Sequence, residues 1–402
     1  MTNSKETRLS RRDFIKTAGA LSAGTMLAPF SRAADASDNP PVVPRRAFGK
    51  TGIDVSILSL GGMFNIEANQ LMLKQAIKWG VNYWDTAHIY NWGRSEKGIG
   101  KYFGKYPEDR QKVFLVTKSG AWTLKGMTTD LEESLERMQT DYVDLFFVHG
   151  IDGAADLKND HMRWAEKAKA AGKIRFFGFS THSNMEYCLL GAAKLGWIDG
   201  IMMTYNYRLM QQDRMKEAVE ACAEAGIGLT AMKTQGGGQV KTSSESELQL
   251  AGRFLKKGFT DAQAKLKAVW HNPQIASICS QMPNMTILMS NIAAACDRTE
   301  LTARDLELLQ QYARETCSDY CAGCTEICES SLATRVPVGD VMRFLMYARA
   351  YGEPENAKAL FRKIPKNLRA RMTALDYTVA ERKCPRKMAI GRLMKAAAVE
   401  LA

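Results

Sequence analysis

Short apolar runs alternate with helix-like segments along most of this 402-residue chain. We expect strands at residues 55–60, 82–85, 113–118, 143–149, 174–180, 200–205, 228–233 and 277–280. Between these runs, apolar residues recur at i, i+4 and i+7, as in Leu131, Leu135 and Met138, which is typical of amphipathic helices. Regular alternation of strands and helices predicts an α/β fold, a parallel (β/α)8 barrel wound right-handed. Such a barrel takes about 250 residues, so the chain has room for a further region.

Three of the expected strands end on polar residues that can handle protons. Asp85 ends the strand at 82–85, and Tyr90 follows it five residues later. Lys118 and His149 end two later strands. The carboxyl ends of barrel strands share one face, and active sites of barrel enzymes lie on that face. The pattern therefore predicts a catalytic site.

These residues carry a resemblance to a known family. The stretch DTAHIYNWGRSE at 85–96, together with Lys118 and His149, resembles the aldo-keto reductases in order, residue type and spacing. The similarity runs from about Arg45 to Asn291. It implies the (β/α)8 barrel, reduction of an aldehyde or ketone to an alcohol (or the reverse), and a small carbonyl or alcohol substrate. The implied catalytic residues are Asp85, Tyr90, Lys118 and His149.

The resemblance also implies how these four residues act. Carbonyl reduction needs a general acid, and Tyr90 is the candidate. A tyrosine normally titrates near 10, so we expect the Lys118 ammonium to lower the pKa of Tyr90. Asp85 is expected to hold Lys118, and His149 to donate to the carbonyl oxygen.

A nicotinamide cofactor, NADPH or NADH, is implied as well, but its binding pattern is incomplete. Thr181 stands where the family usually has Asn, Met202 replaces a Gln, and Ile287 replaces the Arg that holds the 2′-phosphate. The preference between the two nucleotides is therefore open. The expected cofactor-binding residues are Ser180, Thr181, Tyr205, Lys233 and Asn291.

The N-terminus is expected to be a targeting segment. Residues 1–33 contain the run SRRDFIK, which closely matches the twin-arginine export motif, followed by an apolar run too short to span a membrane. A basic disordered tail is the alternative. Residues 34–44 form a Pro-rich linker, and the barrel is expected at 45–300. The prediction is export of the folded protein to the periplasm or another extracytoplasmic compartment.

Residues 301–402 are expected to form a helical C-terminal domain in which the cysteines concentrate. The pattern Cys-x2-Cys-x3-Cys with a distant Cys-Pro resembles ferredoxin-type iron–sulfur ligation, and it implies one 4Fe-4S cluster. Cys317 is the spare cysteine. A zinc site and one or two disulfides are the alternatives. The expected metal ligands are Cys321, Cys324, Cys328 and Cys384.

Positive charge is concentrated at the C-terminus. Residues 341–402 carry 14 Lys and Arg against 5 Asp and Glu, a net charge of +9. Such a surface suits an acidic redox partner or an anionic membrane surface, and the sequence shows no nucleic-acid-binding module. Two alternative functions are a zinc-stabilised reductase without a redox cluster and an electron-transfer or scaffold protein with an inactive barrel.

Overall fold

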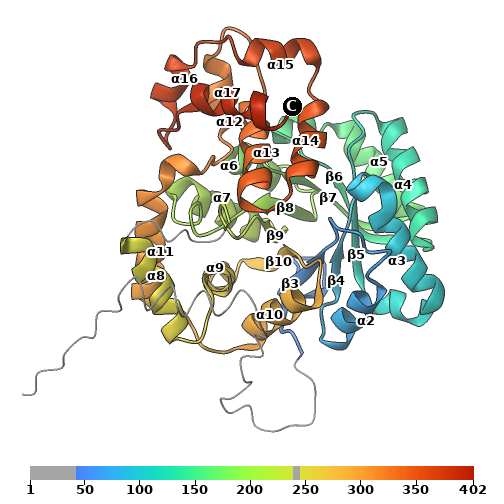
Figure 1. The fold of residues 1–402 in the computed structure, drawn as a ribbon. Coiled ribbons are helices and arrows are strands. Elements are labelled where there is room, and N and C mark those ends of the chain that lie inside the picture. Colours follow the sequence, from blue (N-terminus) through green and yellow to red (C-terminus); the bar gives the residue numbers. More distant parts are fainter. Residues whose placement is uncertain (1–41, 239–244) are drawn as a thin grey trace, which may run out of the picture. The chain divides into compact units, whose positions relative to one another are not determined.

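The computed structural model describes residues 42–238 and 245–402, and in this part eight parallel strands close into a barrel (Figure 1). Neighbouring strands follow the order β10-β3-β4-β5-β6-β7-β8-β9, so the expected α/β fold with a (β/α)8 barrel is confirmed. The strands are β3 (Leu58–Gly61), β4 (Tyr83–Asp85), β5 (Phe114–Ser119), β6 (Val143–Val148), β7 (Ile174–Thr181), β8 (Gly200–Thr204), β9 (Gly228–Met232) and β10 (Ile275–Gln281).

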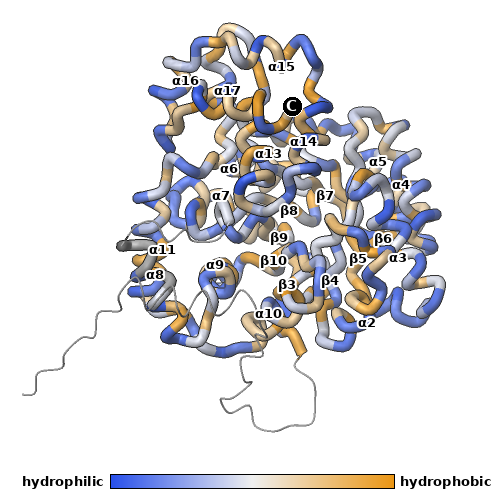
Figure 2. The backbone as a smooth tube through the Cα atoms, viewed as in Figure 1, coloured by the Kyte–Doolittle hydropathy of each residue, from blue (hydrophilic) through white to orange (hydrophobic). Residues whose placement is uncertain are grey.

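Hydrophilic and hydrophobic residues are interspersed along the helices between and after the strands (Figure 2). In α4, the buried residues include Met127, Leu131 and Met138, spaced one or two helical turns apart. The helices are α2 (Gln70–Lys78), α3 (Arg94–Lys105), α4 (Leu124–Met138), α5 (Asn159–Ala170), α6 (Met185–Ala193), α7 (Asp213–Glu224), α8 (Glu245–Lys256), α9 (Asp261–Trp270) and α10 (Met285–Cys296).

The first expected strand, at 55–60, is divided in the structure between β2 (Asp54–Ser56) and β3, which begins after Ile57. Strand β2 pairs antiparallel with β1 (Arg45–Ala47) to form a hairpin. The ring of Phe48, within this hairpin, lies at the amino ends of the barrel strands. A Cβ atom at Gly200 or Gly228 would come within 2.8 or 2.5 Å of that ring, so both positions require glycine. The hairpin therefore closes the barrel face opposite to the expected active site.

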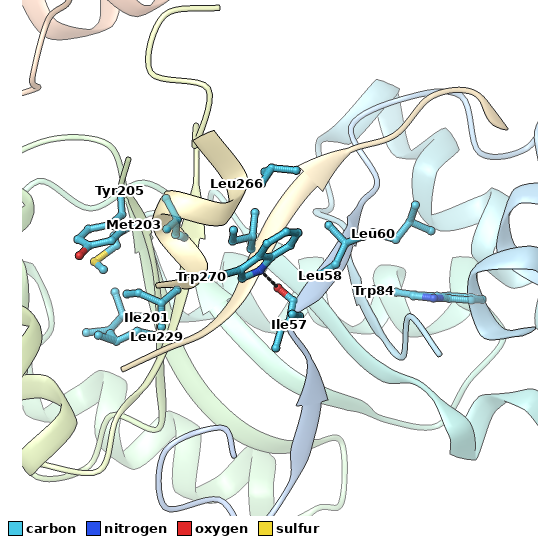
Figure 3. Packing of buried hydrophobic residues seen from close by; sticks show 14 of the residues in the cluster. Ile57, Leu58, Leu60, Trp84, Ile201, Met203, Tyr205, Leu229, Leu266 and Trp270 are labelled. Atoms are coloured by element: carbon cyan, nitrogen blue, oxygen red, sulfur yellow. Dashed lines mark hydrogen bonds between the residues drawn. The ribbon is translucent and has the colours of Figure 1, made fainter. Parts of the chain in front are cut away.

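Strand residues alternate between two apolar layers. Tyr83, Phe114 and Met202 belong to the cluster inside the barrel. Ile201 and Met203, the neighbours of Met202, belong to the outer cluster between strands and helices (Figure 3). This alternation decides which strand-end side chains can reach the barrel mouth.

The C-terminal part of the chain is helical, as expected. Among the described residues, no helix is long and apolar enough to cross a membrane. Helix α11 contributes Leu309 and Tyr312 to the outer cluster of the barrel, whereas residues from Cys328 to Leu401 form a cluster of their own. The helices are α11 (Ala303–Glu315), α12 (Thr325–Cys328), α13 (Val338–Ala350), α14 (Pro354–Arg362), α15 (Lys366–Met372), α16 (Thr378–Lys383) and α17 (Ile390–Glu400).

The structure also joins α11 to the barrel through a buried carboxylate. Asp305 is fully buried and pairs with Arg253 of α8, at 2.5 Å, and with Lys257, which directly follows α8. Its carboxylate also accepts hydrogen bonds from Thr302, and these partners hold the pKa of Asp305 below its usual range. By its packing, α11 is an outer barrel helix, and the separate C-terminal cluster begins later than the expected boundary at residue 301. The predicted signal peptide at 1–33 and most of the linker at 34–44 lie outside the described residues.

Candidate active site

The structure brings the four expected catalytic residues together at the carboxyl ends of three neighbouring strands. Asp85 is the last residue of β4, Lys118 lies at the end of β5, and His149 directly follows β6. Tyr90 opens the short helical turn η1 (Tyr90–Gly93) after β4. Because β4 pairs with β5 and β5 pairs with β6, the residues at the carboxyl ends of these strands lie beside one another.

Lys118 lies at the centre of this group. Its side chain is 1% exposed, and its ammonium donates to Asp85 Oδ1 at 2.6 Å and to the Thr86 carbonyl at 2.8 Å. It also lies 3.3 Å from the hydroxyl oxygen of Tyr90. The second oxygen of Asp85 accepts from the Cys279 thiol at 3.6 Å. Burial raises the pKa of Asp85, and the Lys118 ammonium opposes that rise.

Tyr90 is held in a neutral state. Burial, and after it the negative charge of Asp85, raises the pKa of Tyr90 well above 10. The expectation of a lowered pKa for Tyr90 is not met, because burial and the charge of Asp85 together raise it even with the Lys118 ammonium 3.3 Å from the hydroxyl. The turn that carries Tyr90 is strained, since Asn91 and Trp92 both adopt left-handed φ angles, of 51° and 57°.

His149 faces Tyr90. The two ring centroids lie 5.7 Å apart, with an interplanar angle of 77°. Burial, followed by the charge of Lys118, lowers the pKa of His149 to about 3, so the imidazole is neutral at ordinary pH. Its Nδ1 atom is buried and has no hydrogen-bond partner among the described residues. A ring nitrogen is thus available to a ligand.

A second histidine at the barrel mouth was not among the expected site residues. His182 directly follows β7, and its Nδ1 lies 3.1 Å from Thr204 Oγ1 at the end of β8. Burial, followed by the charges of Arg343 and Lys233, lowers the pKa of His182 well below 6.5. The strand alternation could have indicated it, because inward-facing positions of β7 recur at every second residue, through Ser180 to His182.

The five expected cofactor-binding residues are only partly brought together. Thr181, the last residue of β7, and Tyr205, directly after β8, both lie on the outward side. The Thr181 hydroxyl donates to the Ser183 carbonyl, and the Tyr205 hydroxyl accepts from Asn272. Both were expected to contact the cofactor, and the alternation of each strand directs them away from the mouth.

The other three expected cofactor-binding residues, Ser180, Asn291 and Lys233, lie nearer the barrel mouth. The Ser180 hydroxyl accepts from the amide of Gly150, and the Asn291 amide donates to Ser280. The ammonium of Lys233, at the end of β9, lies 4.5 Å from the centre of the Tyr347 ring in α13. Lys233 adopts a left-handed φ of 56° and is close enough to affect the titration of Asp85 and His149.

Four of the C-terminal cysteines share one small cavity of about 20 Å³. Burial, reinforced by the neighbouring thiols, raises the pKa of Cys321 and Cys328 to about 12. Cys317 does not line this cavity. All nine cysteines are free, and no three His, Cys, Asp or Glu side chains in 42–238 and 245–402 stand in a ready metal-binding arrangement. The four that line the cavity are Cys321, Cys324, Cys328 and Cys384.

Comparison with known proteins gives two family matches. The model of the aldo/keto reductase family matches residues 58–315, and that of the twin-arginine translocation pathway signal sequence matches residues 8–28. The second match points to export across the membrane by the twin-arginine route. Residues 316–402 lie beyond the reductase match.

Individual relatives agree with the first match. An aldo-keto reductase from Fusarium vanettenii is 29% identical over 232 residues, which is 46% of this chain and 62% of that protein. L-galactose dehydrogenase from Arabidopsis thaliana is 24% identical over 295 residues, 66% of this chain and 92% of that protein. The chain spans only 62–66% of the length of the first curated relatives that it matches.

Among solved structures, the holo form of aldo-keto reductase AKR11C1 from Bacillus halodurans superposes with a TM-score of 0.57 at 24% identity. The superposition covers 67% of this chain and 96% of the Bacillus halodurans chain. This likeness concerns the fold. Because the family model covers well over half of the sequence, and the barrel joins the residues that carry the resemblance, the chain belongs to the aldo/keto reductase family.

Proposed function

We propose that this protein reduces an aldehyde or ketone to an alcohol, or catalyses the reverse reaction, with Tyr90 as the general acid. One observation carries the proposal. The Lys118 ammonium lies 2.6 Å from Asp85 and 3.3 Å from the Tyr90 hydroxyl, and the imidazole of His149 faces the same tyrosine ring. A proton donor, a charge that stabilises its conjugate base and a second hydrogen-bonding group thus meet at one point.

Each residue has a role that follows from its surroundings. The neutral Tyr90 hydroxyl donates a proton to the carbonyl oxygen as negative charge develops there. The tyrosinate that remains is stabilised by the Lys118 ammonium, which Asp85 keeps charged and fixed. The neutral imidazole of His149 carries one N–H, which can donate to the same oxygen and orient the carbonyl.

We propose NADPH or NADH as the cofactor, which supplies the hydride when bound. The residues present fit such a nucleotide in part. Lys233 offers a positive charge near the mouth, and Gly236, Gly237 and Gly238 present a run of backbone in left-handed conformations. Ile287, on α10, is 37% exposed and offers no charge to a 2′-phosphate, so we expect little preference for NADPH.

We further propose that the four clustered cysteines hold one 4Fe-4S cluster, which supplies one-electron chemistry when bound. Their thiols are free and line one cavity, which supports a shared metal centre over disulfides. The Cys321 sulfur accepts a hydrogen bond from the amide of Gly323, and Arg386 lines the same cavity, so both can stabilise negative thiolates. A four-thiolate zinc site is the competing assignment.

Export would create a need for such a cluster, because an exported reductase requires another source of electrons. Free nicotinamide nucleotides are not expected outside the cytoplasm, and we propose that the mature protein works in the periplasm. A cluster beside the barrel would give electrons from an external donor a route to a nicotinamide nucleotide trapped during folding, and two one-electron steps with uptake of one proton would regenerate its reduced form. The positively charged segment 341–402 supports an acidic redox partner or an anionic membrane surface as the docking site.

Replacement of Tyr90 tests the general acid. Tyr90→Phe removes only the hydroxyl, and we expect turnover to fall by about 10²–10⁴-fold with little change in thermal stability. Tyr187→Phe is the matched control, because Tyr187 is exposed on α6 and is expected to leave turnover unchanged. Steady-state kinetics with an aldehyde substrate makes the measurement. Normal turnover in Tyr90→Phe would remove Tyr90 from the mechanism.

The pH profile tests the protonation states. Since the pKa of His149 is lowered to about 3 and that of Tyr90 is raised above 10, neither group changes charge at intermediate pH. We expect kcat/KM for reduction to be flat between about pH 5 and pH 9, and to fall in acid as His149 gains a proton. A limb near pH 6.5 that disappears in His149→Asn would contradict these assignments.

Iron analysis tests the metal site. Anaerobically purified protein is expected to be brown and to hold about four irons per chain. Serine at any one of the four cavity cysteines should lower the iron content, whereas Cys317→Ser is the matched control and should retain it. Stoichiometric zinc without iron decides for the zinc site instead.

A further inference from the structure

The largest cavity of the described residues has a volume of about 450 Å³ and lies where the barrel mouth meets the C-terminal helices. On the barrel side it is lined by His182, Lys233 and the glycines at 236–238 that we assign to the nucleotide. On the other side it is lined by Arg343 of α13 and Arg392 of α17. None of the four catalytic residues lines this cavity, so a group bound in it is held apart from the reacting carbonyl.

The loop after β9, residues 233–238, is hydrogen-bonded to the C-terminal region, and we call it the glycine loop. Asn206 is fully buried, and its side-chain amide donates to the Lys233 carbonyl at 3.1 Å and to the Tyr320 hydroxyl at 2.9 Å. Tyr320 lies beyond residue 315, where the reductase family match ends. One buried amide thus joins the start of the glycine loop to a segment outside the family match.

The other end of the glycine loop is bound in the same way. The Arg208 guanidinium donates to the Gly236 carbonyl at 2.6 Å and to Thr316 Oγ1 at 2.8 Å. A Cβ atom at Gly238, whose φ is 98°, would lie 2.9 Å from the Ala350 carbonyl oxygen, so the loop backbone packs directly against α13. The glycine loop can therefore open only by breaking contacts with the C-terminal region.

The lining of the cavity is cationic. It includes five Lys and Arg residues and one carboxylate, that of Asp319. Two of the cations are already occupied, because Arg208 holds the glycine loop and Arg349 makes a two-bond pair with Glu400. The other three cations are those of Lys233, Arg343 and Arg392.

These three cations are open to a ligand. Lys233 and Arg392 have no acidic partner in the described part of the chain. Arg343 pairs with Asp340 through one nitrogen at 2.7 Å, and the Asp340 side chain is 44% exposed, so this surface pair is weak and leaves other guanidinium donors free. Positive charges gathered in a cavity repel one another, and a bound anion relieves that repulsion.

A diphosphate group matches these features. Guanidinium groups bind phosphate oxygens through paired hydrogen bonds, and backbone in left-handed conformations can present N–H groups to an anion. In a nicotinamide dinucleotide the diphosphate is joined to the nicotinamide ring through a ribose. It is therefore bound away from the carbon that transfers the hydride, as the lining of this cavity requires.

We propose that Arg343 and Arg392 bind the diphosphate of the nicotinamide nucleotide against Lys233 and the glycine loop, and that the C-terminal region thereby makes release of the nucleotide slow. The inference rests on the proposed nucleotide cofactor and adds to its site two residues from outside the family match. Slow release suits an exported protein, because a nucleotide lost outside the cytoplasm is not replaced.

Release of NADH from the mature, anaerobically purified protein tests the proposal. Protein loaded with NADH is mixed with excess ADP-ribose, and the change in NADH fluorescence gives the dissociation rate. We expect Arg343→Gln with Arg392→Gln to speed release by about 10–100-fold, since each arginine loses charged hydrogen bonds. Arg343→Lys with Arg392→Lys keeps the charges and should restore part of the slow release.

Lys366→Gln with Arg371→Gln is the matched control. Both residues are exposed on α15 and do not line the cavity, and their replacement removes the same total charge. Release should keep the wild-type rate in this control, and melting temperatures check that each variant is folded. If the control speeds release as much as the Arg343 and Arg392 variant does, the effect is one of overall charge and the proposal is wrong.

Two further readouts locate the contact on the diphosphate. The Arg343 and Arg392 variant should weaken binding of NADH and NADPH equally, because both carry the diphosphate, whereas a loss confined to NADPH assigns the arginines to the 2′-phosphate and overturns the proposal. Release from the wild type should become faster as salt rises, because salt screens charge contacts. A release rate that ignores salt also overturns the proposal, and this measurement does not depend on the folding of any variant.

The proposal and the proposed carbonyl reduction can fail separately. Slow release that is lost in the Arg343 and Arg392 variant, with no aldehyde reduced by the wild type, supports the diphosphate site and rejects carbonyl reduction. Reduction of an aldehyde with NADH, with equal release rates in the wild type and this variant, overturns the inference and leaves the reductase standing. A wild type that binds no NADH overturns both the inference and the proposed cofactor.

Discussion

The active site depends on a buried ion pair between Lys118 and Asp85, whose side chains are 1% and 2% exposed. Removing two charges from water costs several kcal/mol for each, and only close contact and further hydrogen bonds offset that cost. The barrel provides both, because the register of β4 and β5 sets the two strand ends side by side and the Thr86 carbonyl accepts a third bond. The same pair fixes the charge beside Tyr90, so its geometry determines how that hydroxyl can act.

The C-terminal region contributes side chains to the cavity at the barrel mouth. Judged from sequence, the positive charge of residues 341–402 suggested an external partner. In the structure, Arg343, Arg349 and Arg392 instead line the cavity at the barrel mouth, and Cys321 lines both this cavity and the cysteine cavity. The two proposed centres, for carbonyl reduction and for electron transfer, thus lie on either side of one short segment. The exposed cations of α15 and α16 remain for docking.

The sequence predicted the barrel, and the structure brings the four expected catalytic residues together at its mouth, because both depend on local patterns. Apolar runs locate strands, and a polar residue at each strand end marks the active face. It predicted Thr181 and Tyr205 poorly, because a motif gives position along the chain while strand alternation decides the direction of each side chain. His182 was missed because the alternation along β7 was not followed past Ser180. Arg343 was missed for another reason, because its place near the barrel mouth arises from contact between distant segments, which neither spacing nor composition reveals. The raised pKa of Tyr90 likewise depends on burial, which only the fold determines.

The central claim is that this exported barrel still works as a nucleotide-dependent reductase. Fluorescence titration of the purified, folded protein with NADPH and NADH tests it most directly. Because Lys233 remains and Ile287 offers no charge for a 2′-phosphate, we predict that both nucleotides bind, with dissociation constants within about tenfold of each other. Absence of binding of either nucleotide at millimolar concentration would contradict the account.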